Sequence, residues 1–139
     1  MRQNRIYECD VTNSCKLPFF DIRVQAGLPS IADSTSFIKL DINKHLIKNP
    51  ASTFFVEVRG ESMINAGIKE NDILVVDKFK APRSNNIVIA VINSKFSIRR
   101  LLVKDDRMFL IAENTDSVFL EVKENTYICG VVTSIVKKL

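Results

Sequence analysis

Short apolar runs alternate with short polar segments over the second part of the chain. The apolar runs are rich in β-branched and aromatic residues and have the length of strands, and they cover residues 53–59, 72–78, 86–93, 96–103, 108–112, 118–122 and 127–136. Asn, Asp, Ser, Pro and Glu separate them, at residues 69–71, 82–85, 93–94, 105–106, 113–116 and 124–125. Strand-length runs that recur at a spacing of roughly 8–12 residues are typical of an all-β domain. The pattern predicts a mostly β protein with an all-β domain over residues 51–139.

Residues 1–50 have a different character. They contain three of the four prolines and no long periodic segment. One short helix is predicted over residues 41–47, with Asp41 as its N-cap and Pro50 beyond its end. We expect an N-terminal arm over residues 1–50, weakly packed over residues 1–16. Residues 17–40 should lie extended on the body, because they contain apolar side chains to bury: Leu17, Phe19, Phe20, Ile22, Val24 and Leu28.

Charge and hydropathy exclude several classes of protein. The net charge of +4 comes from lysines and arginines spread along the chain, with doublets only at Arg99-Arg100 and Lys137-Lys138. A nucleic-acid interface usually needs clustered basic residues, so a mixed, solvated surface is the better interpretation. No apolar run approaches the roughly 18 residues of a membrane helix, and the N-terminus lacks the apolar core of a signal peptide. We therefore expect a cytoplasmic protein without a membrane segment.

The cysteines and the glycines argue against metal and cofactor sites. Three cysteines, Cys9, Cys15 and Cys129, are an odd number that fits a reducing compartment. With His45 as the single histidine, no Cys/His set has zinc spacing. The four glycines form no phosphate-binding loop. We expect no metal and no cofactor, and we interpret Cys129 as a small core residue.

One polar turn between two apolar runs contains a candidate nucleophile. Ser62 lies in Gly60-Glu61-Ser62-Met63, at the end of the run 53–59. A catalytic serine needs a base, and His45 is a weak candidate because it lies in a short polar helix. The other chemical solution is a lysine kept neutral by burial in an apolar strand. From these residues alone, an ordinary turn serine is the commoner interpretation.

Longer stretches of the sequence change that weighting. They are LPFFDIRVQAGLPS, ASTFFVEVRGESMINAGIKENDILVVDK, NNIVIAVINSKFSIRRLLV, IAENTDS and ICGVVTSIVKKL. Together they resemble the LexA/UmuD family of self-cleaving serine peptidases over nearly all of the chain from Leu17 onward. The most specific element is a G-x-S-M turn followed by G-I-x-x-x-D-x-L-x-V-D. The resemblance implies a curved all-β, peptidase-like body of the LexA C-terminal-domain type, with a regulatory N-terminal arm that folds across the active site.

The resemblance also implies a role for particular residues. The nucleophile of the family falls on Ser62, and the bond that the family cleaves falls on Ala26-Gly27. The general-base lysine of the family lies 37 residues after the serine, and here that position is Arg99. Arginine is not deprotonated in proteins, so it cannot take the serine proton. We therefore expect lost or very slow self-cleavage, with Lys95 and His45 as the other bases to test.

Three functions remain open. The resemblance implies a homodimeric regulatory subunit of an error-prone translesion DNA polymerase in the SOS response, activated when a RecA filament on single-stranded DNA promotes cleavage. Its partners would be a UmuC-like Y-family polymerase and the polymerase sliding clamp. Arg99 instead favours a non-proteolytic binding module that acts at full length. A LexA-type repressor fragment is the third, although residues 1–50 leave no room for a winged helix-turn-helix that reads DNA.

Overall fold

The computed structural model describes residues 5–8, 17–19 and 38–139 of the chain. These residues belong to two compact units. The first unit contains residues 5–8 and 49–139, and the second contains residues 17–19 and 38–48. Cys9, Cys15 and residues 20–37 lie outside the described residues.

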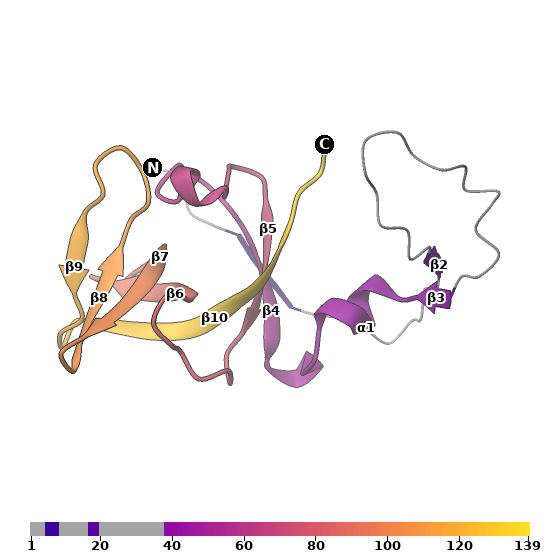
Figure 1. The fold of residues 1–139 in the computed structure, drawn as a ribbon, viewed down its shortest axis with the longest axis horizontal. Coiled ribbons are helices and arrows are strands. Elements are labelled where there is room, and N and C mark those ends of the chain that lie inside the picture. Colours follow the sequence, from indigo (N-terminus) through magenta and orange to yellow (C-terminus); the bar gives the residue numbers. More distant parts are fainter. Residues whose placement is uncertain (1–4, 9–16, 20–37) are drawn as a thin grey trace. The chain divides into compact units, whose positions relative to one another are not determined.

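The first unit is built on one sheet of eight strands (Figure 1). Their order across the sheet is β1-β4-β5-β10-β6-β7-β8-β9, and every neighbouring pair is antiparallel. Two short 3-10 helices, η2 (Pro50–Ser52) and η3 (Ile64–Ala66), flank β4. The strands are β1 (Arg5–Glu8), β4 (Thr53–Glu57), β5 (Ile73–Asp77), β6 (Ile87–Ile92), β7 (Lys95–Lys104), β8 (Arg107–Ile111), β9 (Phe119–Glu121) and β10 (Thr126–Val136).

This architecture confirms the predicted mostly β fold, because each of the seven apolar runs coincides with one strand to within two residues at each end. The polar segments between the runs supply the backbone conformations that hairpins require. Asn93 and Ser94 join β6 to β7, and Asp105 and Asp106 join β7 to β8, all with positive φ angles of 50° to 65°. Two-residue turns with positive φ at both positions match the twist of the flanking strands, and Asn and Asp tolerate that conformation.

Strand β10 bends the sheet, as the long yellow ribbon in Figure 1 shows. Its pairing shifts between Val132 and Ser134 on the β5 side and between Ile128 and Gly130 on the β6 side. Such irregularities bend a strand and increase its twist. The buried side chains form two clusters. One contains Val56, Val58, Met63, Ile68, Leu74, Val76, Ile89 and Ile98, and the other contains Val88, Ala90, Leu101, Leu110 and Val131.

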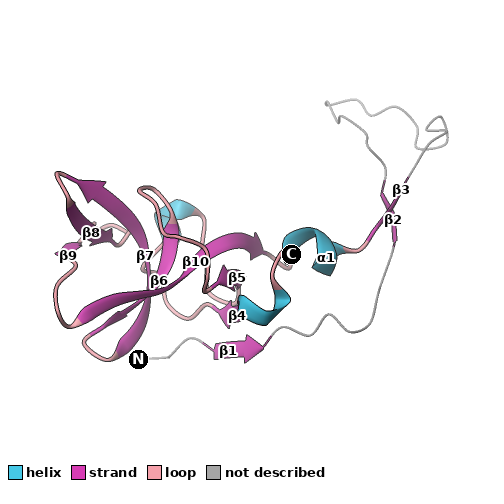
Figure 2. Ribbon diagram, turned by 90° about the horizontal axis from the view of Figure 1, so that it is seen from below, coloured by secondary structure: helices cyan, strands magenta, loops and turns pink. Residues whose placement is uncertain are grey.

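The pairing of strand β1 with the sheet differs from the expectation that residues 1–16 pack weakly. Arg5–Glu8 pairs antiparallel with β4 and forms one edge of the sheet (Figure 2). Its side chains add little, since Ile6 and Tyr7 are 47% and 42% exposed. The Tyr7 hydroxyl donates a hydrogen bond to Glu57 Oε2 at 3.0 Å. Backbone pairing to an open edge needs no apolar pattern, so the polar composition of the segment did not indicate it.

The second unit contains a two-stranded sheet and the one α-helix found among the described residues. Strand β2 (Leu17–Phe19) pairs antiparallel with β3 (Ile38–Leu40). Helix α1 (Ile42–Leu46) follows, and the Asp41 side chain accepts hydrogen bonds from the backbone N–H groups of Asn43 and Lys44. The predicted helix and its N-cap are confirmed, and the helix ends before Pro50.

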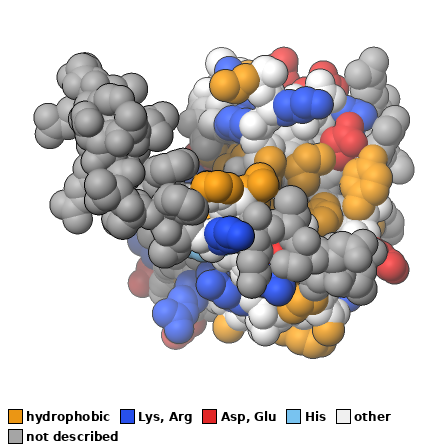
Figure 3. Space-filling model, turned by 90° about the vertical axis from the view of Figure 1, so that its right-hand side faces the viewer, with side chains coloured by type: hydrophobic (Ala, Val, Ile, Leu, Met, Phe, Trp, Pro, Cys, Tyr) orange, Lys and Arg blue, Asp and Glu red, His pale blue; other side chains and the backbone are white. Residues whose placement is uncertain are grey.

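The surface of the described residues mixes apolar and charged side chains (Figure 3). In the view of Figure 3, blue basic side chains lie between orange apolar ones and red acidic ones. Among the described residues, no helix has the length and apolar character needed to cross a membrane.

Candidate serine site at the end of strand β4

The turn that carries Ser62 begins where β4 leaves the sheet. Backbone hydrogen bonds tie the end of that strand to the start of β5, from Val58 N to Asp72 O at 2.8 Å and from Asn71 N to Val58 O at 2.9 Å. Gly60 then reverses the chain with φ 93°, a left-handed conformation that side chains rarely adopt. Gly67 ends η3 with φ 80°. Two glycines thus define the turn from both ends.

Met63 anchors this turn in the core. Its side chain is only 1% exposed and packs in the cluster that contains Val56 and Ile98. The backbone N–H of Glu113 donates to Met63 Sδ at 3.4 Å, and Asn65 N donates to Glu113 O at 2.8 Å. The turn is therefore held against the connection between β8 and β9. A thioether is an apolar, adaptable core group, so we assign Met63 a packing role.

The Ser62 hydroxyl donates to the backbone carbonyl of Ile98, on β7, at 3.4 Å. This distance exceeds the usual range for a hydroxyl donor, so the bond is weak. The carbonyl is available because backbone groups alternate between the two edges of an antiparallel strand. Leu101, three residues further along β7, exchanges backbone hydrogen bonds with Asn85 and Asn86 on the β6 side. The backbone groups of Ile98 therefore point to the opposite side of the strand, toward β8. The β8 pairing starts only at Arg100.

Arg99 donates to the same carbonyl. Its Nη1 lies 2.8 Å from Ile98 O, so the arginine makes a shorter bond than Ser62 does. The side chain is half-buried, and burial lowers the pKa of its guanidinium. The ordinary pKa of arginine lies far above neutral pH, so Arg99 remains a cation and a donor. The two residues that the sequence analysis paired therefore meet at one oxygen atom, although 36 residues separate Ser62 from Ile98.

Arg100 has a different environment from its neighbour. Its Nε and Nη2 donate to Glu113 Oε1 and Oε2 at 2.5 and 3.3 Å, and its Nη1 donates to Asn85 O at 2.9 Å. Glu113 is the residue whose backbone holds Met63 and Asn65. Arg100 thus supports the serine turn indirectly, a role that the sequence analysis missed. The only signal was an acidic residue in the predicted turn 113–116.

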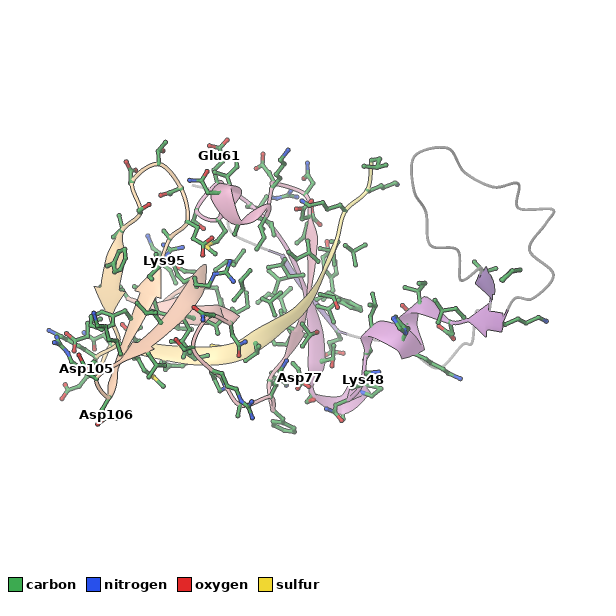
Figure 4. All side chains as sticks on the ribbon, viewed as in Figure 1. Lys48, Glu61, Asp77, Lys95, Asp105 and Asp106 are labelled. Carbon is green, nitrogen blue, oxygen red and sulfur yellow. The ribbon has the colours of Figure 1, made fainter. Side chains whose placement is uncertain are left out.

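The other residues considered for the site lie elsewhere. Lys95 is exposed at the first residue of β7, and among the described residues no hydrogen bond joins it to Ser62 (Figure 4). Four residues along a strand amount to roughly 13 Å from Arg99. His45 is exposed on α1, in the second unit. Ala26 and Gly27 lie outside the described residues.

The described residues that contact the Ser62 hydroxyl can hold it, but none of them is a base that would take its proton. Arg99 offers only donors, and the Ile98 carbonyl is too weak a base. Glu61, beside the serine, is exposed at the outer side of the turn (Figure 4). Across residues 5–8, 17–19 and 38–139, no group of three or more His, Cys, Asp and Glu side chains is placed to hold a metal ion.

Comparisons with known proteins identify the class of this fold and site. The family model described as Peptidase S24-like matches residues 18–133. Protein ImpA of Salmonella typhimurium is 38% identical over 121 residues, which cover 87% of this chain and 83% of ImpA. Protein SamA of Salmonella typhimurium strain LT2 is 39% identical over 121 residues, 87% of this chain and 85% of SamA. Protein MucA of Escherichia coli is 33% identical over 120 residues, 84% of this chain and 82% of MucA. The chain belongs to the Peptidase S24-like family.

Within that family the chain is UmuD-like, because ImpA, SamA and MucA are UmuD-family proteins. The resemblance seen in the sequence is thereby confirmed over most of the chain. Membership supports a part in SOS mutagenesis and the general setting of UmuD and UmuC in translesion synthesis.

Proposed function

We propose that this chain is a cytoplasmic, homodimeric, UmuD-like regulatory subunit of a UmuC-like, error-prone translesion polymerase, and that its own peptidase site is defective. Ser62 is the nucleophile of that site, Ala26-Gly27 is the bond it would cleave, and Arg99 stands at the base position. The RecA filament on single-stranded DNA is the stimulus for cleavage, and the sliding clamp is a further partner. Residues 1–50 act as the regulatory arm, and residues 51–139 form the catalytic and dimerisation domain.

One observation carries the proposal about chemistry. Ser62 and Arg99 both donate to Ile98 O, so the residue at the base position competes with the serine hydroxyl instead of accepting its proton. General-base assistance is typically worth about 10²- to 10⁴-fold in rate. We therefore expect this chain to cleave itself more slowly than a lysine-containing version by a factor on that order.

The experiment compares the chain with Arg99→Lys and with the double variant Arg99→Lys, Ser62→Ala. Each protein is incubated from neutral to alkaline pH, with and without a RecA filament, and its intact mass is followed. Only Arg99→Lys should give fragments that end at Ala26 and begin at Gly27. Its rate should rise with pH, because a lysine acts as a base only after it loses its proton.

Ser62→Ala is the control that separates self-cleavage from a contaminating protease. The assignment of Arg99 is wrong if the unmodified chain cleaves at Ala26-Gly27 as fast as Arg99→Lys does. Substitution of Lys95 and then of His45 would in that case identify the base.

Arg99 also favours a second function, a UmuD-like binding module that acts at full length without a proteolytic step. Binding of the polymerase to the intact chain, compared with the fragment that begins at Gly27, distinguishes the two. A repressor fragment is the remaining alternative, and a mobility shift with duplex DNA tests it. Sedimentation at micromolar concentration tests the dimer.

A further inference from the structure

The doublet Arg99-Arg100 contains two arginines with opposite surroundings. The guanidinium of Arg100 meets the Glu113 carboxylate with two hydrogen bonds, so its charge is compensated. Among the described residues, Arg99 makes one hydrogen bond, to the neutral Ile98 carbonyl. Within the part of the chain that the structure describes, no carboxylate forms an ion pair with Arg99. A half-buried cation therefore lies beside Ser62 without a counter-ion from those residues.

Ser62 and Arg99 have unused capacity for a ligand. A guanidinium carries five N–H donors, and Ile98 O takes only one of those of Arg99. The Ser62 bond to the same oxygen is long, so the hydroxyl can turn to another acceptor at little cost. Because both side chains bond one oxygen, their donors lie close together. Both are also partly exposed, so a small ligand in solution can reach them.

The charges around the pair favour a monoanion. Removing a guanidinium from water without a partner is unfavourable, and a bound anion relieves that penalty. Arg100 adds no net charge, since Glu113 compensates it. Glu61, exposed next to Ser62, disfavours a doubly charged phosphate. A carboxylate has one negative charge and two coplanar oxygens, which match the fork of an arginine.

We propose that Ser62 and Arg99 form a binding site for a carboxylate, with Arg99 donating to both ligand oxygens and Ser62 donating to one of them. The ligand is a peptide carboxylate, either at a chain end or on an acidic side chain. The site uses the same two residues as the proposed peptidase site, but it does not require the cleavage reaction. Failure of Arg99→Lys to cleave would thus leave it intact.

The test is a titration of the isotope-labelled, full-length chain followed by nuclear magnetic resonance. The probes are N-acetylalanine, which ends in a carboxylate; its uncharged amide; N-acetylaspartate α-amide, in which only the side-chain carboxylate is free; and inorganic phosphate. The signals are the Arg99 Nε–H and the backbone N–H of Ser62. Arg99→Gln removes the charged fork. Lys104→Gln is the matched control, because it removes one exposed positive charge from the far end of the same strand.

We expect N-acetylalanine to bind saturably, with one site per chain, and the amide to cause no saturable shift. Arg99→Gln should weaken binding by at least about tenfold, as the loss of a charge-assisted pair predicts. Lys104→Gln should leave binding within about twofold of the original, since the effect of a distant exposed charge is screened. Equal binding of the aspartate probe assigns the site to side-chain and terminal carboxylates alike, and weaker binding assigns it to chain ends.

Three results would overturn the proposal. They are equal binding of the amide, an equal loss in Arg99→Gln and Lys104→Gln, and tighter binding of phosphate than of either carboxylate. If Arg99→Gln does not fold, as its spectrum will reveal, Ser62→Ala replaces it and should weaken binding severalfold. If Ser62→Ala does not weaken binding, the serine is not part of the site and the proposal is rejected.

Discussion

The ion pair between Arg100 and Glu113 offers a quantitative test of how the serine turn is supported. The perturbations are Arg100→Gln, Glu113→Gln and the double variant, which together form a double-mutant cycle. The two side chains are 29% and 28% exposed, and two hydrogen bonds join them. Hydrogen bonds to charged groups contribute about 1.5–3 kcal/mol. Partial exposure screens the pair, so we expect a coupling energy at the low end, about 1–2 kcal/mol.

The assay is urea denaturation at neutral pH, with the free energy of unfolding of all four proteins measured under the same conditions. Arg100→Gln should cost about 2 kcal/mol, because it also removes the hydrogen bond to Asn85 O. Exchange of the Asn65 amide proton should become faster in the same variant. That proton is donated to Glu113 O, whose position depends on the ion pair.

The exposed pair Arg107 and Glu121 is the matched control, since it has similar bidentate geometry but an arginine that is 59% exposed. Its coupling energy should be smaller and should fall more steeply with salt. The reasoning fails if the coupling between Arg100 and Glu113 is below about 0.3 kcal/mol, the usual error of additivity. It also fails if exchange at Asn65 does not change.

Three further predictions concern the core and its titrating groups. Gly130→Ala should destabilise the fold by about 1–3 kcal/mol in urea denaturation. The reason is steric, because a Cβ at this position would lie 2.6 Å from Val76 Cγ1. An unchanged stability would contradict the close packing of β10 on β5. Burial raises the pKa of the Asp77 carboxyl, but the hydrogen bonds that this carboxyl accepts hold the pKa below its ordinary value. Among these hydrogen bonds, the one from the Ser52 hydroxyl at 2.7 Å lowers the pKa most. The stability that Asp77 contributes is therefore present above about pH 3.9 and is lost as the pH falls through the lower folded pKa; acid titration of stability should lose part of this slope in Asp77→Asn. Burial raises the pKa of the Cys129 thiol. In a variant whose other two cysteines are replaced by serine, Cys129 should therefore react more slowly with a thiol reagent than free cysteine does. Equal rates would argue against the burial of Cys129.

Much of the sheet follows from local sequence alone. Strand-length apolar runs between Asn, Asp and Ser turns locate β4 to β10. Both signals are local: the pattern of apolar residues within a strand and the turn residues that tolerate positive φ each depend on only a few neighbouring positions. The turn that holds Ser62 is similarly local, since Gly60 and Gly67 supply its positive φ angles. The family motif and its 37-residue spacing indicated that Arg99 belongs near the serine. The structure places both at the Ile98 carbonyl.

Tertiary structure decided the features that depend on pairing between distant segments. Two adjacent arginines look equivalent in the sequence, yet Arg100 reaches Glu113, which lies 13 residues away across the β7–β8 hairpin, and Arg99 donates to the backbone carbonyl of Ile98. Strand β1 pairs with a strand about fifty residues away, through backbone groups that every residue carries. Such contacts depend on strand order and register. These are set by packing of the whole domain, so the local preferences that predicted the strands do not contain them.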